Sequence, residues 1–337
     1  MKQEKIGVIL AQIGTPSEPT AKAVRPYLKR FLSDRRIVDY HPLLWQPLLQ
    51  GVILTVRPKR SAKLYKEIWT EQGSPLRVYL HKQQVGLQER LGEGFRVEVG
   101  MAYSEPSIEQ AMRVLENEGI TRIIIMPLFP QYSSTTTASV YDEACFAALG
   151  RRSASGSTAK RFVPTLRFVD AYYNHPGYIA AMKHHLEQQL KSLQSPPDKF
   201  ILTFHGIPQR YADTGDPYPD QCLETAELLA REMGWARDQW GIVYQSRFGR
   251  EPWVGPATFD VLGDLARQGV KRPFLFAPGF ATDCLETLHE IGVEGREVFE
   301  NAGGPGELYT MAPCLNDQAT WLDFLTEYVR SNAQGWV

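Results

Sequence analysis

The chain repeats one pattern of strand, polar turn, helix and strand at an interval of about 150 residues. Residues 97–130 and 242–280 each contain a strand, a turn with Glu-Pro, a helix, a glycine and a second strand. The two halves also begin alike, because LAQIGTP at 10–16 resembles LTFHGIP at 202–208. This interval is too long for a solenoid and indicates two similar domains, each with its own sheet.

Short apolar runs alternate with segments of helical periodicity along the chain, which predicts an α/β fold with parallel sheets. The predicted strands are Ile6–Ala11, Phe95–Ala102, Arg122–Leu128, Phe162–Val169, Phe200–Phe204, Ile242–Gln245, Phe274–Ala277 and Leu308–Met311. We assign residues 1–170 to the first domain and residues 171–317 to the second. A final helix within 318–337 would pack on either domain, and we assign it to the first.

Composition excludes several classes of protein. Lys plus Arg number 37 and Asp plus Glu number 38, so a net charge of −1 argues against a nucleic-acid partner. The four cysteines are widely spaced, which argues against a zinc ribbon or a disulfide scaffold and fits a reducing cytosol. The longest apolar stretch, Leu43–Val56, falls short of the roughly 20 residues of a membrane span. With no secretory signal at the N-terminus, we expect a cytoplasmic protein.

The common motifs of α/β enzymes are missing: no G-x-G-x-x-G follows a strand, and there is no P-loop, G-x-S-x-G or H-E-x-x-H. Ligands of open parallel sheets bind at the carboxyl ends of the strands, which directs attention to the residues found there. His205 ends one predicted strand. It is either a hydrogen-bonded histidine that orients a loop, or a base or metal ligand at the mouth of a cleft.

The segment ATDCLETLHEI follows another strand and carries three carboxylates. Asp283, Glu286 and Glu290 are spaced i, i+3, i+7, which places them on one face of an α-helix. Such a stripe is either a solvated helix start, favoured by the helix dipole, or a site for an Fe(II)-like cation or for protons leaving a substrate. Its position beside a predicted ligand-binding turn favours the site.

Several motifs together resemble the ferrochelatase family: LTFHGIPQRYADTGDPYP, QSRFGREPW, APGFATDCLETLHEI, PLFPQYSSTTT and GSPL. The resemblance runs from Gly7 to about Val329 and is greatest to proteobacterial members that use protoporphyrin IX. It implies two Rossmann-like, chelatase-type domains whose parallel sheets face each other across a porphyrin cleft. It also implies a lyase of haem biosynthesis that inserts Fe2+ into protoporphyrin IX and releases two protons. The alternatives are a coproporphyrin ferrochelatase and a non-catalytic tetrapyrrole or metal carrier.

The resemblance also implies roles for single residues. His205 and Glu286 would be the catalytic residues and metal ligands, with His205 acting as proton acceptor or as first ligand. Asp283 and Glu290 would continue a path for protons or metal. The positions that match porphyrin-binding residues are Ile13, Arg57, Tyr65, Ser74, Tyr103, Phe129 and Trp253. Among these, Arg57 and Ser74 would hold porphyrin carboxylates and the aromatic rings would line the macrocycle, whereas the alternative for each aromatic residue is ordinary core packing.

Iron is implied as a substrate, together with protoporphyrin IX, and no prosthetic group is expected. Some relatives hold a [2Fe–2S] cluster on cysteines near the C-terminus, but no cysteine follows Cys314 here, so we predict no cluster. Residues 43–56 match an apolar lip, and the basic residues of 57–60 follow it directly. This lip either packs on the protein or rests on the inner face of the membrane, with Trp45 and the cations of 57–60 at the lipid headgroups.

Overall fold

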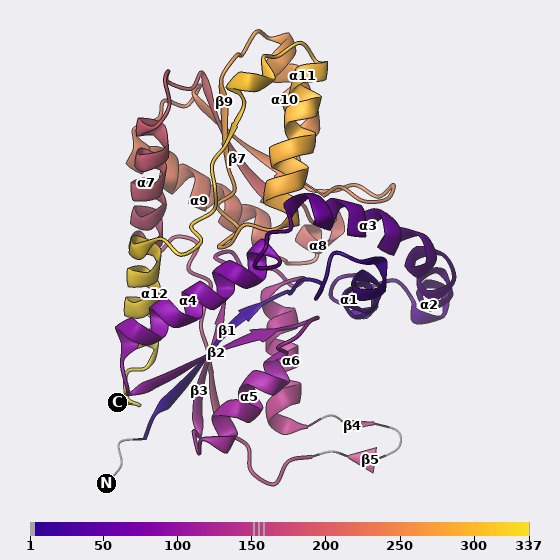
Figure 1. Cartoon of the computed structure of the whole chain (residues 1–337), viewed down its shortest axis with the longest axis vertical. Coiled ribbons are helices and arrows are strands. Elements are labelled where there is room, and N and C mark those ends of the chain that lie inside the picture. Colours follow the sequence, from indigo (N-terminus) through magenta and orange to yellow (C-terminus); the bar gives the residue numbers. More distant parts are fainter. Residues whose placement is uncertain (1–3, 151, 154–155, 158, 337) are drawn as a thin grey trace. The chain divides into compact units, whose positions relative to one another are not determined.

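The computed structural model describes residues 4–150, 152–153, 156–157 and 159–336. This part of the chain folds into two compact units, each built around its own sheet (Figure 1). Unit 1 comprises Met1–Phe129, Ser134–Asp170 and Leu322–Val337, and unit 2 comprises Pro130–Ser133 and Ala171–Trp321. The residues of the predicted domain ranges that lie outside the described part are 1–3, 151, 154–155, 158 and 337.

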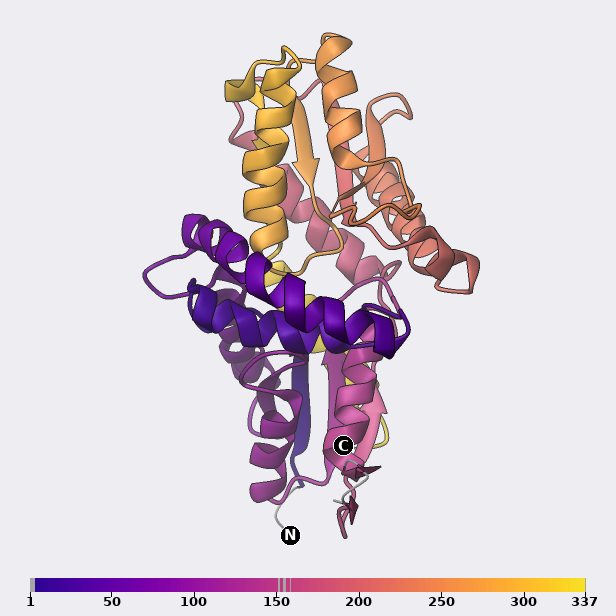
Figure 2. The same ribbon diagram turned by 90° about the vertical axis from the view of Figure 1, so that its right-hand side faces the viewer.

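The sheet of unit 1 is parallel and has the strand order β2-β1-β3-β6. Its strands are β1 (Ile6–Gln12), β2 (Phe95–Met101), β3 (Arg122–Pro127) and β6 (Thr165–Phe168). Every residue of the central strand β1 is buried, as expected for a strand covered on both faces. One face is covered by α5 (Ile108–Asn117) and α6 (Thr137–Leu149), which lie in front of β1 and β3 in Figure 2.

The other face of this sheet is covered by α4 (Pro75–Leu91), beside which lies most of α12 (Ala319–Asn332) (Figure 1). These two helices approach closely, because a Cβ on Gly86 of α4 would lie only 2.6 Å from the side chain of Leu322. A helical excursion separates β1 from α4. It consists of α1 (Ala21–Ser33), α2 (Pro42–Leu48), the π-helical turn η1 (Leu49–Ile53) and α3 (Leu54–Ile68). An antiparallel pair, β4 (Arg152–Ser153) and β5 (Gly156–Ser157), follows α6.

The sheet of unit 2 is also parallel, with the order β10-β9-β7-β8. Its strands are β7 (Lys199–His205), β8 (Trp240–Gln245), β9 (Pro273–Phe276) and β10 (Thr310–Met311). The apolar side chains of one face pack against α10 (Thr258–Arg267) and α11 (Gly295–Asn301). The remaining helices are α7 (Pro176–Lys191), α8 (Gln209–Asp213), α9 (Tyr218–Met233), the π-helix η2 (Glu286–Glu294) and the 3-10 turn η3 (Gly306–Leu308).

The two strand orders coincide when β1, β2, β3 and β6 are matched with β7, β8, β9 and β10. The predicted fold class, α/β with two similar parallel-sheet units, is therefore confirmed. Two predicted strands are too long, because only Thr165–Phe168 and Thr310–Met311 pair. Both are edge strands with one neighbour each, and residues 306–308 form the turn η3 instead.

The sequence comparison matches the Glu-Pro pair 105–106 after β2 with the pair 251–252 after β8, but the structure matches these two turns differently. Met101 N–H donates to the carbonyl of Pro106 at 2.8 Å, and Tyr244 N–H donates to the carbonyl of Pro256 at 2.8 Å. Pro256, and not Pro252, is thus the counterpart of Pro106. The second turn is longer, and its additional residues form the loop that contains Trp253.

Candidate active site

His205 is the last residue of β7, and its imidazole is oriented by the next residue in the chain. Nδ1 lies 2.6 Å from the carbonyl oxygen of Gly206. Because a carbonyl only accepts, Nδ1 carries a proton, and in the neutral form of the ring Nε2 then presents a lone pair. The half-buried side chain of His205 therefore holds the tautomer that can take a proton or bind a metal ion.

Gly206 allows the ends of β7 and β8 to meet closely. Its N–H donates to the carbonyl of Gln245 at 2.7 Å. A Cβ on Gly206 would stand 2.9 Å from that oxygen and 3.2 Å from the ring of Trp253. Trp253 thus lies beside the residue that follows His205, and Trp253, Gly206 and Gln245 all line a cavity of about 540 Å³.

Glu286 is the first residue of η2, and Gln245 joins this helix to the sheet. Gln245 Nε2 donates to the carbonyl of Glu286 at 3.3 Å, while its Oε1 accepts from Thr203 Oγ1 at 2.9 Å. In the register of β7 and β8, Gln245 is also the partner of His205. The two predicted catalytic residues are therefore both neighbours of Gln245, a buried residue that the sequence reasoning missed although it ends a predicted strand.

The prediction that Asp283, Glu286 and Glu290 share one face of an α-helix is wrong. Asp283 precedes the helix, and the helix is a π-helix with i→i+5 hydrogen bonds and a wider turn. Glu290 interacts electrostatically with both Glu286 and Glu294 along η2. The sequence reasoning missed Glu294 because it assumed the α-helical period, whereas a π-helix has more residues per turn.

Glu290 has the environment of a carboxyl group that exchanges its proton near neutral pH. Burial, with a smaller contribution from the charges of Glu286 and Glu294, raises the pKa of Glu290 to about 7, although the hydrogen bond from Ser246 acts to lower it. Ser246 Oγ donates to Glu290 Oε2 at 2.6 Å, and Ser246 itself has a φ of 110°, in a region that side chains rarely adopt. Strain and a shifted pKa together are typical of a functional site.

In unit 1, the turn after β1 brings several predicted porphyrin-binding residues together. The carbonyl of Ile13 accepts the N–H of Tyr103 at 3.0 Å. Ser74 Oγ lies 2.9 Å from Thr15 Oγ1, although Ser74 is the N-cap residue of α4 and gives that helix no side-chain cap. Phe129, half-buried, follows β3, the neighbour of β1 in the sheet.

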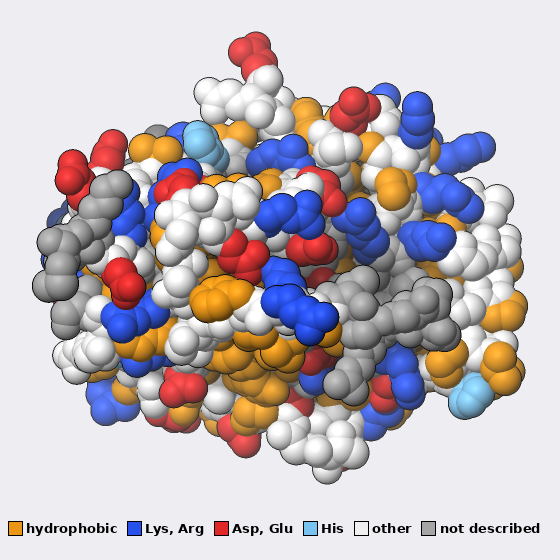
Figure 3. Space-filling model, turned by 90° about the horizontal axis from the view of Figure 1, so that it is seen from below, with side chains coloured by type: hydrophobic (Ala, Val, Ile, Leu, Met, Phe, Trp, Pro, Cys, Tyr) orange, Lys and Arg blue, Asp and Glu red, His pale blue; other side chains and the backbone are white. Residues whose placement is uncertain are grey.

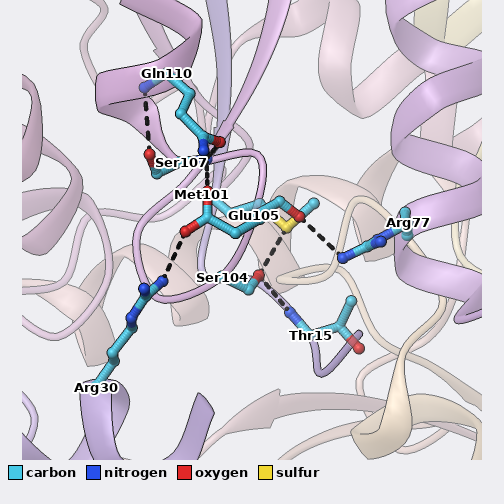
Figure 4. A network of polar contacts seen from close by, with 8 residues as sticks. All are labelled: Thr15, Arg30, Arg77, Met101, Ser104, Glu105, Ser107 and Gln110. Atoms are coloured by element: carbon cyan, nitrogen blue, oxygen red, sulfur yellow. Dashed lines mark hydrogen bonds and ion pairs between the residues drawn. The ribbon is translucent and has the colours of Figure 1, made fainter. Parts of the chain in front are cut away.

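A polar network fixes this turn (Figure 4). Thr15 N–H donates to Ser104 Oγ at 3.1 Å. The next residue, Glu105, pairs with Arg30 at 3.0 Å, and its carbonyl accepts from Arg77 at 2.9 Å. Figure 4 shows these side chains converging from α1, α4 and the turns after β1 and β2, so the loop that carries the predicted site residues is held from several elements.

The other predicted residues of unit 1 lie in the helical excursion or against it. Tyr103 donates its hydroxyl to Asp34 at 2.5 Å, and burial together with the Asp34 charge raises the pKa of Tyr103, which stays protonated. Arg57 and Tyr65 both belong to α3. Tyr65 is buried and packs edge-on against Trp69, whereas Arg57 is half-buried.

The family model for ferrochelatase matches residues 5–333. The chain belongs to the ferrochelatase family. Ferrochelatase 1 of Shewanella oneidensis is 48% identical over 335 residues, covering 98% of this chain and 97% of that protein. The ferrochelatase of Neisseria gonorrhoeae is 42% identical over 335 residues, covering 99% of this chain and 96% of its own. The family and the enzyme class, a metal chelatase, are thus confirmed as the sequence predicts.

A solved structure agrees with the ferrochelatase assignment at the level of the fold. SirB from Bacillus subtilis with Fe3+ has a TM-score of 0.56 to this chain and covers 98% of it, with 97% of its own length. At 13% sequence identity this similarity concerns the fold alone.

The lip of this ferrochelatase-family member, residues 43–56, runs through α2, η1 and the start of α3. Leu43, Leu44 and Val56 are 79%, 76% and 66% exposed. Hydrophobic side chains appear in Figure 3 at the right-hand margin, the side on which Figure 1 places α2. Trp45 is different: it is 6% exposed and donates Nε1–H to the carbonyl of Leu32 at 2.7 Å.

The expectation that Trp45 lies at a membrane surface is therefore wrong. The indole N–H finds its hydrogen-bond partner in α1, and the ring holds the lip on the protein while the leucines face outward. No described helix combines the length and the apolar character needed to cross a bilayer.

Replacing Glu290 by Gln should stabilise this ferrochelatase-family fold above pH 7 and change little near pH 5. With a pKa of about 7 against an ordinary 4.5, native Glu290 keeps its proton where the unfolded chain loses it. The folded state then binds more protons between these values, so stability falls as the pH rises from 4.5 to 7. Above pH 7 the free energy of unfolding is lower by about 3 kcal/mol for this reason, and a glutamine, which does not ionise, avoids this loss. Thermal unfolding at pH 5 and pH 8 measures this; an equal effect at both would contradict the raised pKa.

Proposed function

We propose that this chain inserts ferrous iron into protoporphyrin IX, releasing two protons and forming haem. The observation that carries the proposal is that His205 and Glu286 are both neighbours of Gln245: His205 pairs with it in the sheet, and Gln245 Nε2 donates to the carbonyl of Glu286. Metal insertion needs two pyrrole protons to leave and the ion to shed its water, which a base and a carboxylate serve. Identity of 42–48% to proteins named ferrochelatase supports this reaction over a coproporphyrin enzyme or a carrier.

Within this function, His205 accepts a pyrrole proton or binds the ion through Nε2, and Glu286 is its partner. The electrostatic contact of Glu290 with Glu286 supports a role for Glu290 in proton transfer along η2. The sequence hypothesis assigns Asp283 to the same path. Bending of the macrocycle would expose a nitrogen lone pair, so residues that grip a distorted ring accelerate the reaction.

For porphyrin binding we propose the seven residues that match family positions. Ile13, Tyr65, Tyr103 and Phe129 of unit 1 and Trp253 of unit 2 would present apolar or aromatic surface to the ring. Since the Tyr103 hydroxyl already donates to Asp34, only the ring of Tyr103 is assigned to the porphyrin. The carboxylates would be held by two further residues of unit 1, Arg57 and Ser74.

The function is tested by mixing the protein with protoporphyrin IX and Fe2+ under strict exclusion of oxygen. We expect the absorption spectrum of haem to grow over many turnovers. A porphyrin spectrum that only shifts would identify a carrier. Faster turnover with coproporphyrin under the same conditions would overturn the assignment of protoporphyrin IX as substrate.

We also propose that no iron–sulfur cluster is bound and that iron is solely a substrate. Unit 1 contains Cys145, and unit 2 contains Cys222, Cys284 and Cys314, all with free thiols. Burial raises the pKa of all four thiols, which disfavours the thiolate that ligates a cluster. Anaerobically purified protein should contain no labile sulfide and no charge-transfer absorption; stoichiometric sulfide would contradict this proposal.

Residues 43–60 are proposed to rest on the inner face of the membrane as a peripheral contact. The exposed leucines and valines of the lip, followed by exposed Lys59 and Arg60, combine apolar area with positive charge. The double variant Leu43→Asp/Leu44→Asp should bind vesicles of phosphatidylglycerol and phosphatidylcholine at least about tenfold more weakly in a sedimentation assay, since each buried leucine contributes about 1.5–3 kcal/mol. Val85→Asp, at a residue of α4 that is 45% exposed, is the matched control and should bind normally. Unchanged binding of the double variant would remove the lip from the contact.

A further inference from the structure

Asp283 lies before η2, and both oxygens of its carboxylate are engaged within unit 2. Oδ1 accepts from the N–H of Cys314 and from Thr287 Oγ1, both at 3.1 Å. Oδ2 accepts from Asn316 Nδ2 at 2.6 Å. The residue is 4% exposed, so these donors replace water around the carboxylate.

Asn316 completes a reciprocal pair with Asp283. The N–H of Asp283 donates to Asn316 Oδ1 at 2.9 Å, while Asn316 N–H donates to the carbonyl of Ala281 at 3.0 Å. Asn316 has a φ of 49°, in the left-handed region that asparagine tolerates better than most residues. The pair therefore fixes the segment 314–316 against the segment that leads into η2.

Thr287 transmits this contact to the helix. Its hydroxyl donates to Asp283 and accepts the N–H of Cys284 at 3.0 Å. Thr287 is fully buried and follows Glu286 directly in the chain. The orientation of the first turn of η2, and with it that of Glu286, is thus tied to Asp283.

We propose that Asp283 is a positioning residue for Glu286 and does not itself bind metal ions or protons on their way to the site. A path residue must offer lone pairs to a travelling ion, whereas the oxygens of Asp283 are committed to three donors and withdrawn from solvent. This inference rests on the proposed function, in which Glu286 is catalytic. Residues that hold a reacting group in place typically contribute about 10- to 100-fold to activity.

The test exchanges the two partners of the reciprocal pair. In Asp283→Asn, the new amide nitrogen faces Asn316 Nδ2, so two donors meet and kcat should fall about 10- to 100-fold with KM for the porphyrin little changed. In Asp283→Asn/Asn316→Asp, the amide donates to the new carboxylate and every hydrogen bond of the pair has a donor and an acceptor again. We expect kcat of the double variant to return to within about threefold of the parent. A folded double variant as slow as Asp283→Asn would overturn the proposal, because a path residue needs its carboxylate at 283.

A second pair of variants keeps the proposal testable should the exchange impair folding. Thr287→Val removes the hydroxyl that links Asp283 to η2 but keeps the shape of the side chain, and it should lower kcat as Asp283→Asn does. Thr287→Ser keeps the hydroxyl, so its kcat should stay close to that of the parent. Normal kcat in Thr287→Val would refute positioning through this residue.

Glu286→Gln, measured in the same assay, distinguishes the catalytic role of Glu286 from the positioning role of Asp283. An active Glu286→Gln would refute the proposed catalytic role of Glu286 itself. An inactive Glu286→Gln with no recovery in the exchanged pair would refute only the positioning role of Asp283.

Discussion

Glu286→Gln should reduce iron insertion by at least about a thousandfold while protoporphyrin IX still binds. The substitution keeps the size of the side chain and removes its negative charge. A carboxylate that serves both as proton acceptor and as ligand of the incoming ion loses both functions in the amide. Porphyrin affinity, in contrast, rests on other residues and should stay within about threefold.

The fold should survive this change, because the hydrogen bond that joins η2 to the sheet runs from Gln245 to the backbone carbonyl of Glu286 and not to its side chain. Anaerobic turnover and quenching of porphyrin fluorescence measure the two properties. Glu297→Gln, at an exposed acid of α11, is the matched control and should be fully active. Near-normal turnover of Glu286→Gln would mean that the carboxylate is only a solvated group at a helix start.

His205→Ala should lose several orders of magnitude in turnover and fold normally. General-base assistance is typically worth about 10²–10⁴-fold, and loss of a metal ligand adds to it. The Nδ1 of the ring donates to the adjacent carbonyl of Gly206, at a half-buried position that water can reach. Removing the ring therefore leaves little unpaired.

His185 provides the contrasting control. It is 1% exposed and donates Nε2–H to the carbonyl of Pro313 at 2.8 Å, so His185→Leu should cost about 1–3 kcal/mol of stability and leave activity per folded molecule normal. Thermal melting and anaerobic turnover should be measured on both variants. If His205→Ala behaved like His185→Leu, with a lower melting temperature and normal specific activity, the catalytic assignment of His205 would fail.

The central strands could be predicted from the sequence because a strand that is buried on both faces consists of a nearly continuous run of apolar residues. The segment Ile6–Gln12 is an example, since none of its residues is exposed. The edge strands could not be bounded in this way. Phe162 and Val163 belong to an apolar run but are exposed, because nothing pairs with them beyond Thr165.

The candidate site could be proposed from the sequence where a strand ends, but its neighbours could not be predicted where the helix is a π-helix. His205 and Glu286 are both found from the rule that ligands bind at carboxyl ends of parallel strands. The π-helix η2 changes which acids are neighbours, so Glu294 joins Glu290 while Asp283 turns to Asn316. Asn316 lies 33 residues further along the chain, and a contact between residues so far apart cannot be predicted from the periodicity of the sequence.

The segment Pro130–Ser133 lies in the first half of the sequence but belongs to unit 2, so the two halves of the sequence cannot be inherited independently. Gln131 donates to Thr225 and Ser133 to Asp216, each at 2.9 Å, so part of the interior of the second half is encoded within the first. Recombination at the midpoint of the gene would separate Thr225 and Asp216 from these two buried partners. Selection would therefore act on the two halves of the sequence together.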